Sequence, residues 1–175
     1  PNPSQMLLEG RLTEEPGTCV TCVMEGARPV LAEVQALLTP TSFGTPRRST
    51  NGFDYNRAML LMAVLEKRGG LAVNTCDAYL NVIGGLYLDE PGADLAAILA
   101  LASSFRDRPV PADVVAIGEV GLTGELRSVS ALNQRLSGFT KCLVPQRHGR
   151  ESIVPPDGLQ LIPVRNIRQA LAVLL

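Results

Sequence analysis

Few side chains in this sequence could act as a nucleophile or a base. The single histidine, His148, stands in a polar, arginine-containing stretch with no Gly-x-Ser-x-Gly motif near it. The two lysines, Lys67 and Lys141, close a predicted helix and begin a predicted strand, and neither has an obvious serine partner for a Ser–Lys dyad. Ser103 and Ser104 end an alanine-rich segment, where hydroxyls commonly cap or terminate a helix. The residues alone therefore predict no hydrolytic site.

Cysteine spacing offers little support for a metal site. Of Cys19, Cys22, Cys76 and Cys142, only the first two have the spacing of paired ligands. They lie in a predicted strand, where residues three apart point to opposite faces. We therefore expect buried thiols and no metal.

No glycine-rich phosphate-binding loop occurs, so nucleotide hydrolysis is not predicted.

Composition and charge narrow the class of protein. The chain has 175 residues, with 16 Lys and Arg against 17 Asp and Glu, so a positive overall charge cannot drive nucleic-acid binding. With 46% hydrophobic and 19% charged residues it is too apolar for a disordered chain, and its length suits one domain over 1–175. No apolar run approaches the ~20 residues of a membrane span, and the first ten residues lack the pattern of a secretory leader. We expect a soluble, cytoplasmic domain.

Strand and helix patterns alternate along the chain. A hairpin is predicted over 18–25 and 29–38, followed by an exposed loop over 39–52. Asp54 is the expected N-cap of a helix over 56–68, which Gly69 and Gly70 would end. The remaining predicted strands are 77–83, 86–88, 114–117, 141–144 and 159–163, and the remaining helices are 93–104 and 166–174. This order predicts an α+β (α/β) fold with a mixed sheet and packed helices.

Several motifs in this order resemble the C-terminal domain of the bacterial RadA (Sms) recombination proteins. They are LDEPGADL at 88–95, ASSFRDRPV at 102–110 and IGEVGLTGELR at 117–127. Shorter matches at 24–29, 45–48, 54–57 and 65–68 extend the likeness over nearly the whole chain. That domain is similar to the Lon protease domain, so the resemblance implies a Lon protease-like fold of the ribosomal protein S5 domain 2-like type.

The resemblance also implies that proteolysis is lost. Lon-type peptidases carry their nucleophile in a Pro-Ser-Ala-Gly segment, and this chain has Pro-Gly-Ala-Asp there, with Gly92 at the serine position. Their catalytic lysine corresponds to Asn133. Glycine cannot form an acyl-enzyme and asparagine cannot act as the base, so no catalytic residue is expected. The stretch between Asn133 and Thr140 is shorter than the helix of the family.

From the family we expect a role in ATP-driven branch migration of recombination intermediates. Related proteins carry a zinc finger and a RecA-like ATPase, and neither is encoded in this chain. ATP, Mg and Zn are therefore expected only in those other domains, and no cofactor in this one. This domain would provide a DNA-facing surface and contacts within a homo-oligomer, expected to be a hexamer. A RecA-type recombinase is a further partner that the family raises, and no membrane contact is expected.

Two groups of residues are candidates for these contacts. Arginines on flexible loops can bind phosphates without reading sequence, and the DNA-binding candidates are Arg47, Arg48, Arg147 and Arg150. Aromatic and arginine side chains are favoured in interfaces, and the interface candidates are Phe105, Arg106, Arg108 and Arg57. For the first group the alternative is an ordinary solvated loop. For the second, Phe105 would belong to the core and Arg106 would pair with an acid.

Two other functions remain open from the sequence. The domain could serve as a pure oligomerisation scaffold without DNA contact. It could also be a peptidase with a different nucleophile, such as Ser103 or Ser104.

Overall fold

The structure is a computed structural model that describes residues 14–130, 141–145 and 160–175. Its strands are β1 (Thr18–Glu25), β2 (Arg28–Pro40), β3 (Arg48–Asn51), β4 (Cys76–Ile83), β5 (Val114–Ala116), β6 (Glu119–Val120), β7 (Leu126–Arg127), β8 (Lys141–Pro145) and β9 (Gln160–Val164). Its α-helices are α2 (Tyr55–Gly69), α3 (Asp94–Arg106) and α5 (Ile167–Leu174). Within these described ranges, seven strands form one mixed sheet in the order β3-β4-β2-β1-β5-β8-β9. The α+β class with a mixed sheet is thus confirmed.

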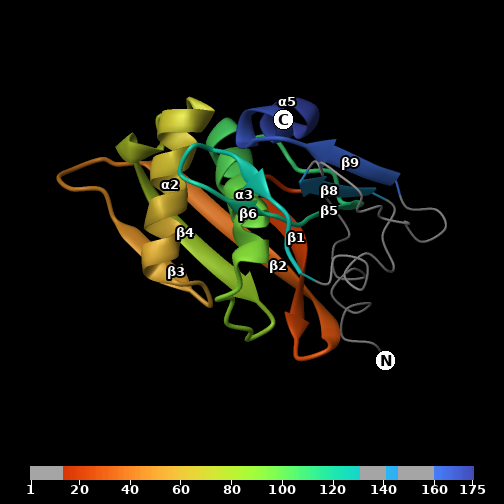
Figure 1. Cartoon of the computed structure of the whole chain (residues 1–175). Coiled ribbons are helices and arrows are strands. Elements are labelled where there is room, and N and C mark those ends of the chain that lie inside the picture. The colour runs from red at the N-terminus through yellow and green to blue at the C-terminus, as the bar shows by residue number, and fades with distance from the viewer. Residues whose placement is uncertain (1–13, 131–140, 146–159) are drawn as a thin grey trace.

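The three α-helices pack together over one face of the sheet (Figure 1). A second, smaller cluster on β1, β5 and β8 contains Cys22 and Cys142, whereas Cys19 belongs to the cluster under the helices. Side chains three apart on β1 thus enter different clusters, as strand geometry requires. All four cysteines are free, buried thiols, as predicted. Burial, and then the neighbouring Cys22 and Cys19, raise the pKa of Cys142 far above its ordinary value.

The first hairpin forms as predicted. β1 and β2 are antiparallel, with Glu25 opposite Arg28, and Gly26 takes a positive φ of 61° in the turn. β2 then pairs along its far edge with β4, so β2 lies inside the sheet. β1 pairs in parallel with β5, which brings the middle of the chain beside its beginning.

The segment after β2 departs from the prediction of an exposed loop over 39–52. Residues 48–51 form β3, which pairs in parallel with β4 from Arg48 opposite Ala78 to Asn51 opposite Asn81. None of the four residues of this edge strand is fully buried, so the polar stretch shows no apolar alternation in the sequence. The extended piece predicted at 86–88 is reduced to a single bridge between Leu88 and Phe53.

Helix α2 begins and ends where its sequence indicates. Asp54 takes the N-cap, and its side chain accepts a hydrogen bond from the Arg57 backbone N–H. Gly70, with a φ of 75°, ends the helix in the left-handed region that glycine adopts at low cost. The helix packs five buried residues against the core: Ala58, Leu61, Met62, Val64 and Leu65.

Helix α3 is the central helix. The 3-10 turn η2 (Pro91–Ala93) leads into it, and every residue from Asp94 to Ser103 is buried. Its alanines and leucines leave no polar face, which is typical of a helix enclosed on all sides. Asp107 ends it in the left-handed region, with φ 55°. None of the helices in the described ranges has the length and apolar character needed to cross a bilayer.

Candidate functional site

Two neighbouring cavities lie at the N-terminal ends of α2 and α3. The larger cavity, of about 290 Å³, is lined by Phe53, Asp54, Arg57, Leu88, Asp89, Glu90, Pro91 and Asp94. The smaller cavity, of about 140 Å³, is lined by Val23, Met24, Glu25, Leu86, Tyr87, Leu88, Asp89 and Glu90. Sheet order brings these separate segments together, because Phe53 follows β3 and Leu88 follows β4. Across residues 14–130, 141–145 and 160–175, no three His, Cys, Asp or Glu side chains are arranged to hold a metal ion.

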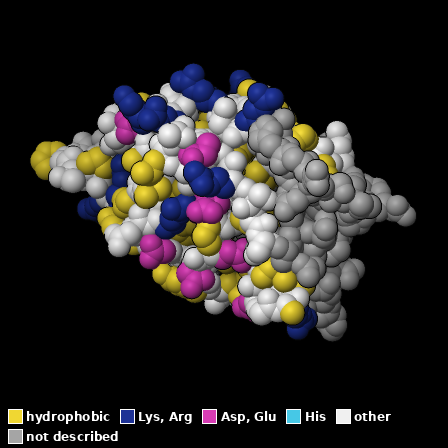
Figure 2. All heavy atoms as spheres, in the orientation of Figure 1, with side chains coloured by type: hydrophobic (Ala, Val, Ile, Leu, Met, Phe, Trp, Pro, Cys, Tyr) yellow, Lys and Arg dark blue, Asp and Glu magenta, His cyan; other side chains and the backbone are white. Residues whose placement is uncertain are grey.

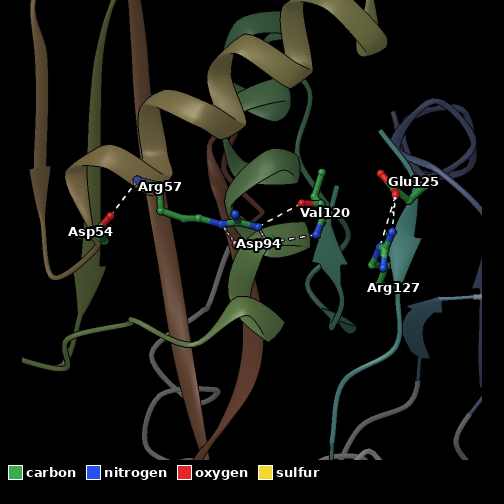
Figure 3. Close-up of polar contacts among 6 residues, drawn as sticks. All are labelled: Asp54, Arg57, Asp94, Val120, Glu125 and Arg127. Atoms are coloured by element: carbon green, nitrogen blue, oxygen red, sulfur yellow. Dashed lines mark hydrogen bonds and ion pairs between the residues drawn. The ribbon is translucent and has the colours of Figure 1, made fainter. Parts of the chain in front are cut away.

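An ion pair forms the inner wall of the larger cavity. Arg57 Nε donates to Asp94 Oδ1 at 2.9 Å, and the Arg57 Nη2 group pairs with Asp94 Oδ2. The same Nη2 donates to the Val120 carbonyl at 3.0 Å, while the Val120 N–H donates to Asp94 Oδ2 at 3.0 Å (Figure 3). One pair of side chains therefore joins α2, α3 and β6.

The pair is unequally buried. The Asp94 side chain is 1% exposed and that of Arg57 is 31% exposed. Burial raises the pKa of Asp94, although the hydrogen bonds from Arg57 and from the Val120 N–H act to lower it. The hydrogen bond to Asp94 raises the pKa of Arg57. Arg57, a predicted interface residue, thus has its guanidinium engaged inside its own chain.

Gly92 lies in η2, beside the larger cavity. It is buried, and its carbonyl accepts a hydrogen bond from the Gly118 N–H at 3.0 Å. The Leu95 N–H in turn donates to the Gly118 carbonyl at 3.1 Å. Only backbone is present at the position where the family resemblance places a serine. Asn133, the position of the lysine, lies outside the described residues.

Both serines at the end of α3 are structural. Ser103 is fully buried, and its Oγ accepts a hydrogen bond from the Gly17 N–H and donates one to the Arg108 carbonyl. Ser104 Oγ accepts a hydrogen bond from the Leu38 N–H at 2.9 Å. These hydroxyls tie α3 to the start of β1 and to β2, whereas the backbone N–H of Asp107 provides the cap at the end of α3.

The first two DNA-binding candidates, Arg47 and Arg48, lie at the start of β3 and differ in how their guanidinium groups are engaged. Arg48 directs its guanidinium to the carbonyls of Cys76 and Val73, so it holds the beginning of β4. Arg47 is exposed, and its backbone N–H donates to Asp77 Oδ1 at 2.7 Å. This bond, with one from Thr41, lowers the pKa of Asp77. Arg147, Arg150 and His148 lie outside the described residues.

The remaining interface candidates follow the end of α3. Phe105 is half-buried and packs against the core, whereas Arg106 is exposed. Arg108 donates from Nη1 to the Leu175 carbonyl at 3.0 Å, which links the end of α3 to the end of the described chain. Of the three, only Arg106 projects from the surface without a hydrogen bond or ion pair to the described residues.

Sequence reasoning missed the gathering of acids around the two cavities. Asp89 and Glu90 stand directly before Pro91, where acidic residues are typical of the start of a helix. Glu90 does hold the N-cap position of η2, but its carboxylate caps nothing there and instead accepts a hydrogen bond from the Met24 N–H at 2.9 Å. Asp54 and Glu25 come from distant segments. Only the strand order brings these acids together, and no local pattern in the sequence signals it.

Comparison with known proteins finds relatives that match nearly all of this chain. No protein-family model matches the chain. DNA repair protein RadA of Bacillus subtilis is 51% identical over 97% of this chain and 38% of its own length. RadA of Streptococcus pneumoniae is 49% identical over 97% of the chain and 41% of its own length. RadA of Halalkalibacterium halodurans is 47% identical over 99% of the chain and 39% of its own length. The chain spans about two fifths of these relatives. Over nearly its whole length, this chain is similar to a segment of the DNA repair protein RadA.

Proposed function

We propose that this chain is a proteolytically inactive, Lon-like domain of a RadA-type DNA repair protein. It would bind DNA and help to form a hexameric ring for ATP-driven branch migration. Support for the repair role comes from relatives that share about half of their residues with nearly all of this chain. The ATPase would reside in the part of such a protein that this chain does not span.

The DNA contact rests on the exposed Arg47 side chain. Within the described ranges its guanidinium makes no hydrogen bond or ion pair, while its backbone is fixed by Asp77 and by pairing with β4. An exposed guanidinium on an ordered backbone can donate two parallel hydrogen bonds to a phosphate. Such a contact reads no base, so binding to duplex or branched DNA would be independent of sequence. Arg147 and Arg150 remain predicted partners in this surface.

The loss of proteolysis rests on Gly92. A buried glycine whose carbonyl is bound to Gly118 offers no atom that can attack a peptide. The alternative nucleophiles Ser103 and Ser104 each have a hydroxyl bound to backbone groups. Neither alternative is therefore favoured.

The DNA proposal can be tested by fluorescence anisotropy with a labelled duplex over a range of salt concentrations. Removing one phosphate contact with Arg47→Ala should weaken binding for every sequence and reduce the salt slope by about one. Arg28→Ala, on the exposed β1–β2 turn, is the matched control and should leave binding unchanged. If Arg47→Ala binds as the wild type does, Arg47 is not in the DNA surface. A chain that assembles but has no DNA affinity at about 50 mM salt would be a pure scaffold.

A further inference from the structure

The two ends of α2 carry opposite charge. At its N-terminal end the cavities are surrounded by acids: Glu25, Asp54, Asp89 and Glu90. At its C-terminal end lie the basic side chains of Lys67, Arg68 and Arg168. In Figure 2 the Lys and Arg side chains lie mostly along the upper edge, and the acidic ones gather lower on the same face. Because a helix rises 1.5 Å per residue, the 15 residues of α2 separate these ends by about 22 Å.

The basic end also presents an apolar side chain on an ordered turn. The β6–β7 turn (121–125) exposes 68% of Leu122. Its backbone closes with hydrogen bonds of 2.9 Å from the Gly121 N–H to the Glu125 carbonyl and from the Gly124 N–H to the Gly121 carbonyl. The Glu125 carboxylate accepts further bonds from Thr123, and Arg68 Nε donates to the Leu122 carbonyl at 3.4 Å. A turn held by so many internal bonds would lose little backbone conformational entropy on binding a partner.

The acidic end presents a matching recess. The smaller cavity has a mixed lining, in which Leu86 and Tyr87, above the buried Val23 and Leu88, provide apolar surface beside the polar groups of its acids, and Tyr87 is 62% exposed at its surface. Its volume of about 140 Å³ is close to the ~150 Å³ of an apolar cavity that holds a benzene-sized group. One leucine side chain is of that size. Acidic side chains border this apolar surface. An apolar side chain flanked by Lys or Arg residues would therefore bind there most favourably.

We propose that a second copy of this chain inserts its β6–β7 turn into the smaller cavity, with Leu122 filling the recess and the basic side chains facing the acids. This contact names the interface for the assembly in the proposed function and rests on that part of it. The two patches differ and lie at opposite ends of α2. The association is therefore head to tail and can continue from copy to copy into a ring. Pairing of two like ends would instead bring equal charges together.

Sedimentation velocity on the whole 175-residue chain tests this interface. Leu122→Asp removes the apolar knob and places a carboxylate against acids, and Tyr87→Glu damages the recess. Each variant alone should associate at least tenfold more weakly than the wild type. Each still carries the undamaged partner surface of the other. An equimolar mixture should therefore form a 1:1 dimer that grows no further, through the one intact contact. Phe43→Asp, at a side chain that is 95% exposed on the loop before β3, is the control and should assemble as the wild type does.

The outcomes separate this interface from assembly in general. If the wild type assembles and Leu122→Asp assembles equally well, or if the mixed variants stay monomeric, the proposed interface is wrong and another surface carries the assembly. If the wild type stays monomeric at every concentration, both the interface and the assembly role fail. DNA binding through Arg47 is measured separately and is unaffected by either result. Circular dichroism checks that both variants fold, as we expect because both side chains are largely exposed.

Discussion

Arg57 and Asp94 form an ion pair that joins the two main helices and reaches the β6–β7 hairpin through both backbone groups of Val120. Desolvating two charges costs free energy that their attraction does not always return. The main effect of the pair is therefore to position the elements that it joins, and its net contribution to stability is secondary. It sets where η2 and the hairpin lie relative to α2, and so it shapes the larger cavity.

Removing Arg57 should be costly. Arg57→Ala leaves the Asp94 carboxylate, which is 1% exposed, without its counter-charge. Breaking a buried pair from one side typically costs 3–5 kcal/mol, and because Arg57 is partly exposed we expect about 3 kcal/mol. Urea unfolding followed by circular dichroism measures the loss. The control Arg106→Ala, at an exposed arginine on the last turn of α3, should change the free energy of unfolding by less than about 0.5 kcal/mol. If Arg57→Ala lost no more stability than this control, water would already compensate the charge of Asp94.

The cost of Arg57→Ala should depend on pH. Burial raises the pKa of folded Asp94 above its ordinary value, and the Arg57 hydrogen bond acts against that rise. Removing Arg57 therefore raises the pKa further. A carboxyl with a raised pKa binds a proton more readily in the folded state than in the unfolded state. Its ionisation therefore lowers the free energy of unfolding as the pH rises above the ordinary aspartate range. The stability difference between wild type and Arg57→Ala should be largest near neutral pH and shrink toward about pH 3.5, where Asp94 is protonated in both. A difference that stays constant over this range would exclude Asp94 ionisation as its cause.

Local sequence signals predicted those elements that local interactions determine. Asp54 and Gly70 fix the ends of α2 through their own backbone contacts, and the composition of α3 marks it as buried. β3 was missed because only its pairing with β4, distant in the chain, makes it a strand. The acidic surround of the cavities was missed for the same reason. Its members come from the ends of β1, β3 and β4, and their neighbourhood depends on the strand order.

Ser103 gives a test of its structural role that also bears on catalysis. Ser103→Ala leaves the Gly17 N–H and the Arg108 carbonyl without their partner in a buried site. Unsatisfied buried groups cost about 1–3 kcal/mol each, so unfolding by urea should show a loss of at least about 1 kcal/mol. Ser104→Ala, at a partly buried position with one such bond, should cost less. Casein hydrolysis by the wild type that disappears in Ser103→Ala, while the variant stays folded, would instead make Ser103 a nucleophile.

Gly52 controls the approach of β3 to the segment that lines both cavities. It has a φ of 79°, and its carbonyl accepts a hydrogen bond from the Leu88 N–H at 2.7 Å. A Cβ added there would lie 2.7 Å from the Leu86 carbonyl oxygen and 2.9 Å from Val82 Cβ. Gly52→Ala therefore combines an unfavourable backbone conformation with a clash against backbone, and we expect a loss of about 3 kcal/mol in urea unfolding. Gly84→Ala is the matched control, because its φ of 99° is also positive but nothing lies within 4 Å of an added Cβ. It should show only the conformational cost of about 1–2 kcal/mol.

The clash at Gly52 would also displace Leu86 from the smaller cavity, so Gly52→Ala should weaken self-association more than Gly84→Ala does. Equal losses for the two variants in both measurements would show that the contact of Gly52 with Leu86 contributes nothing beyond backbone strain.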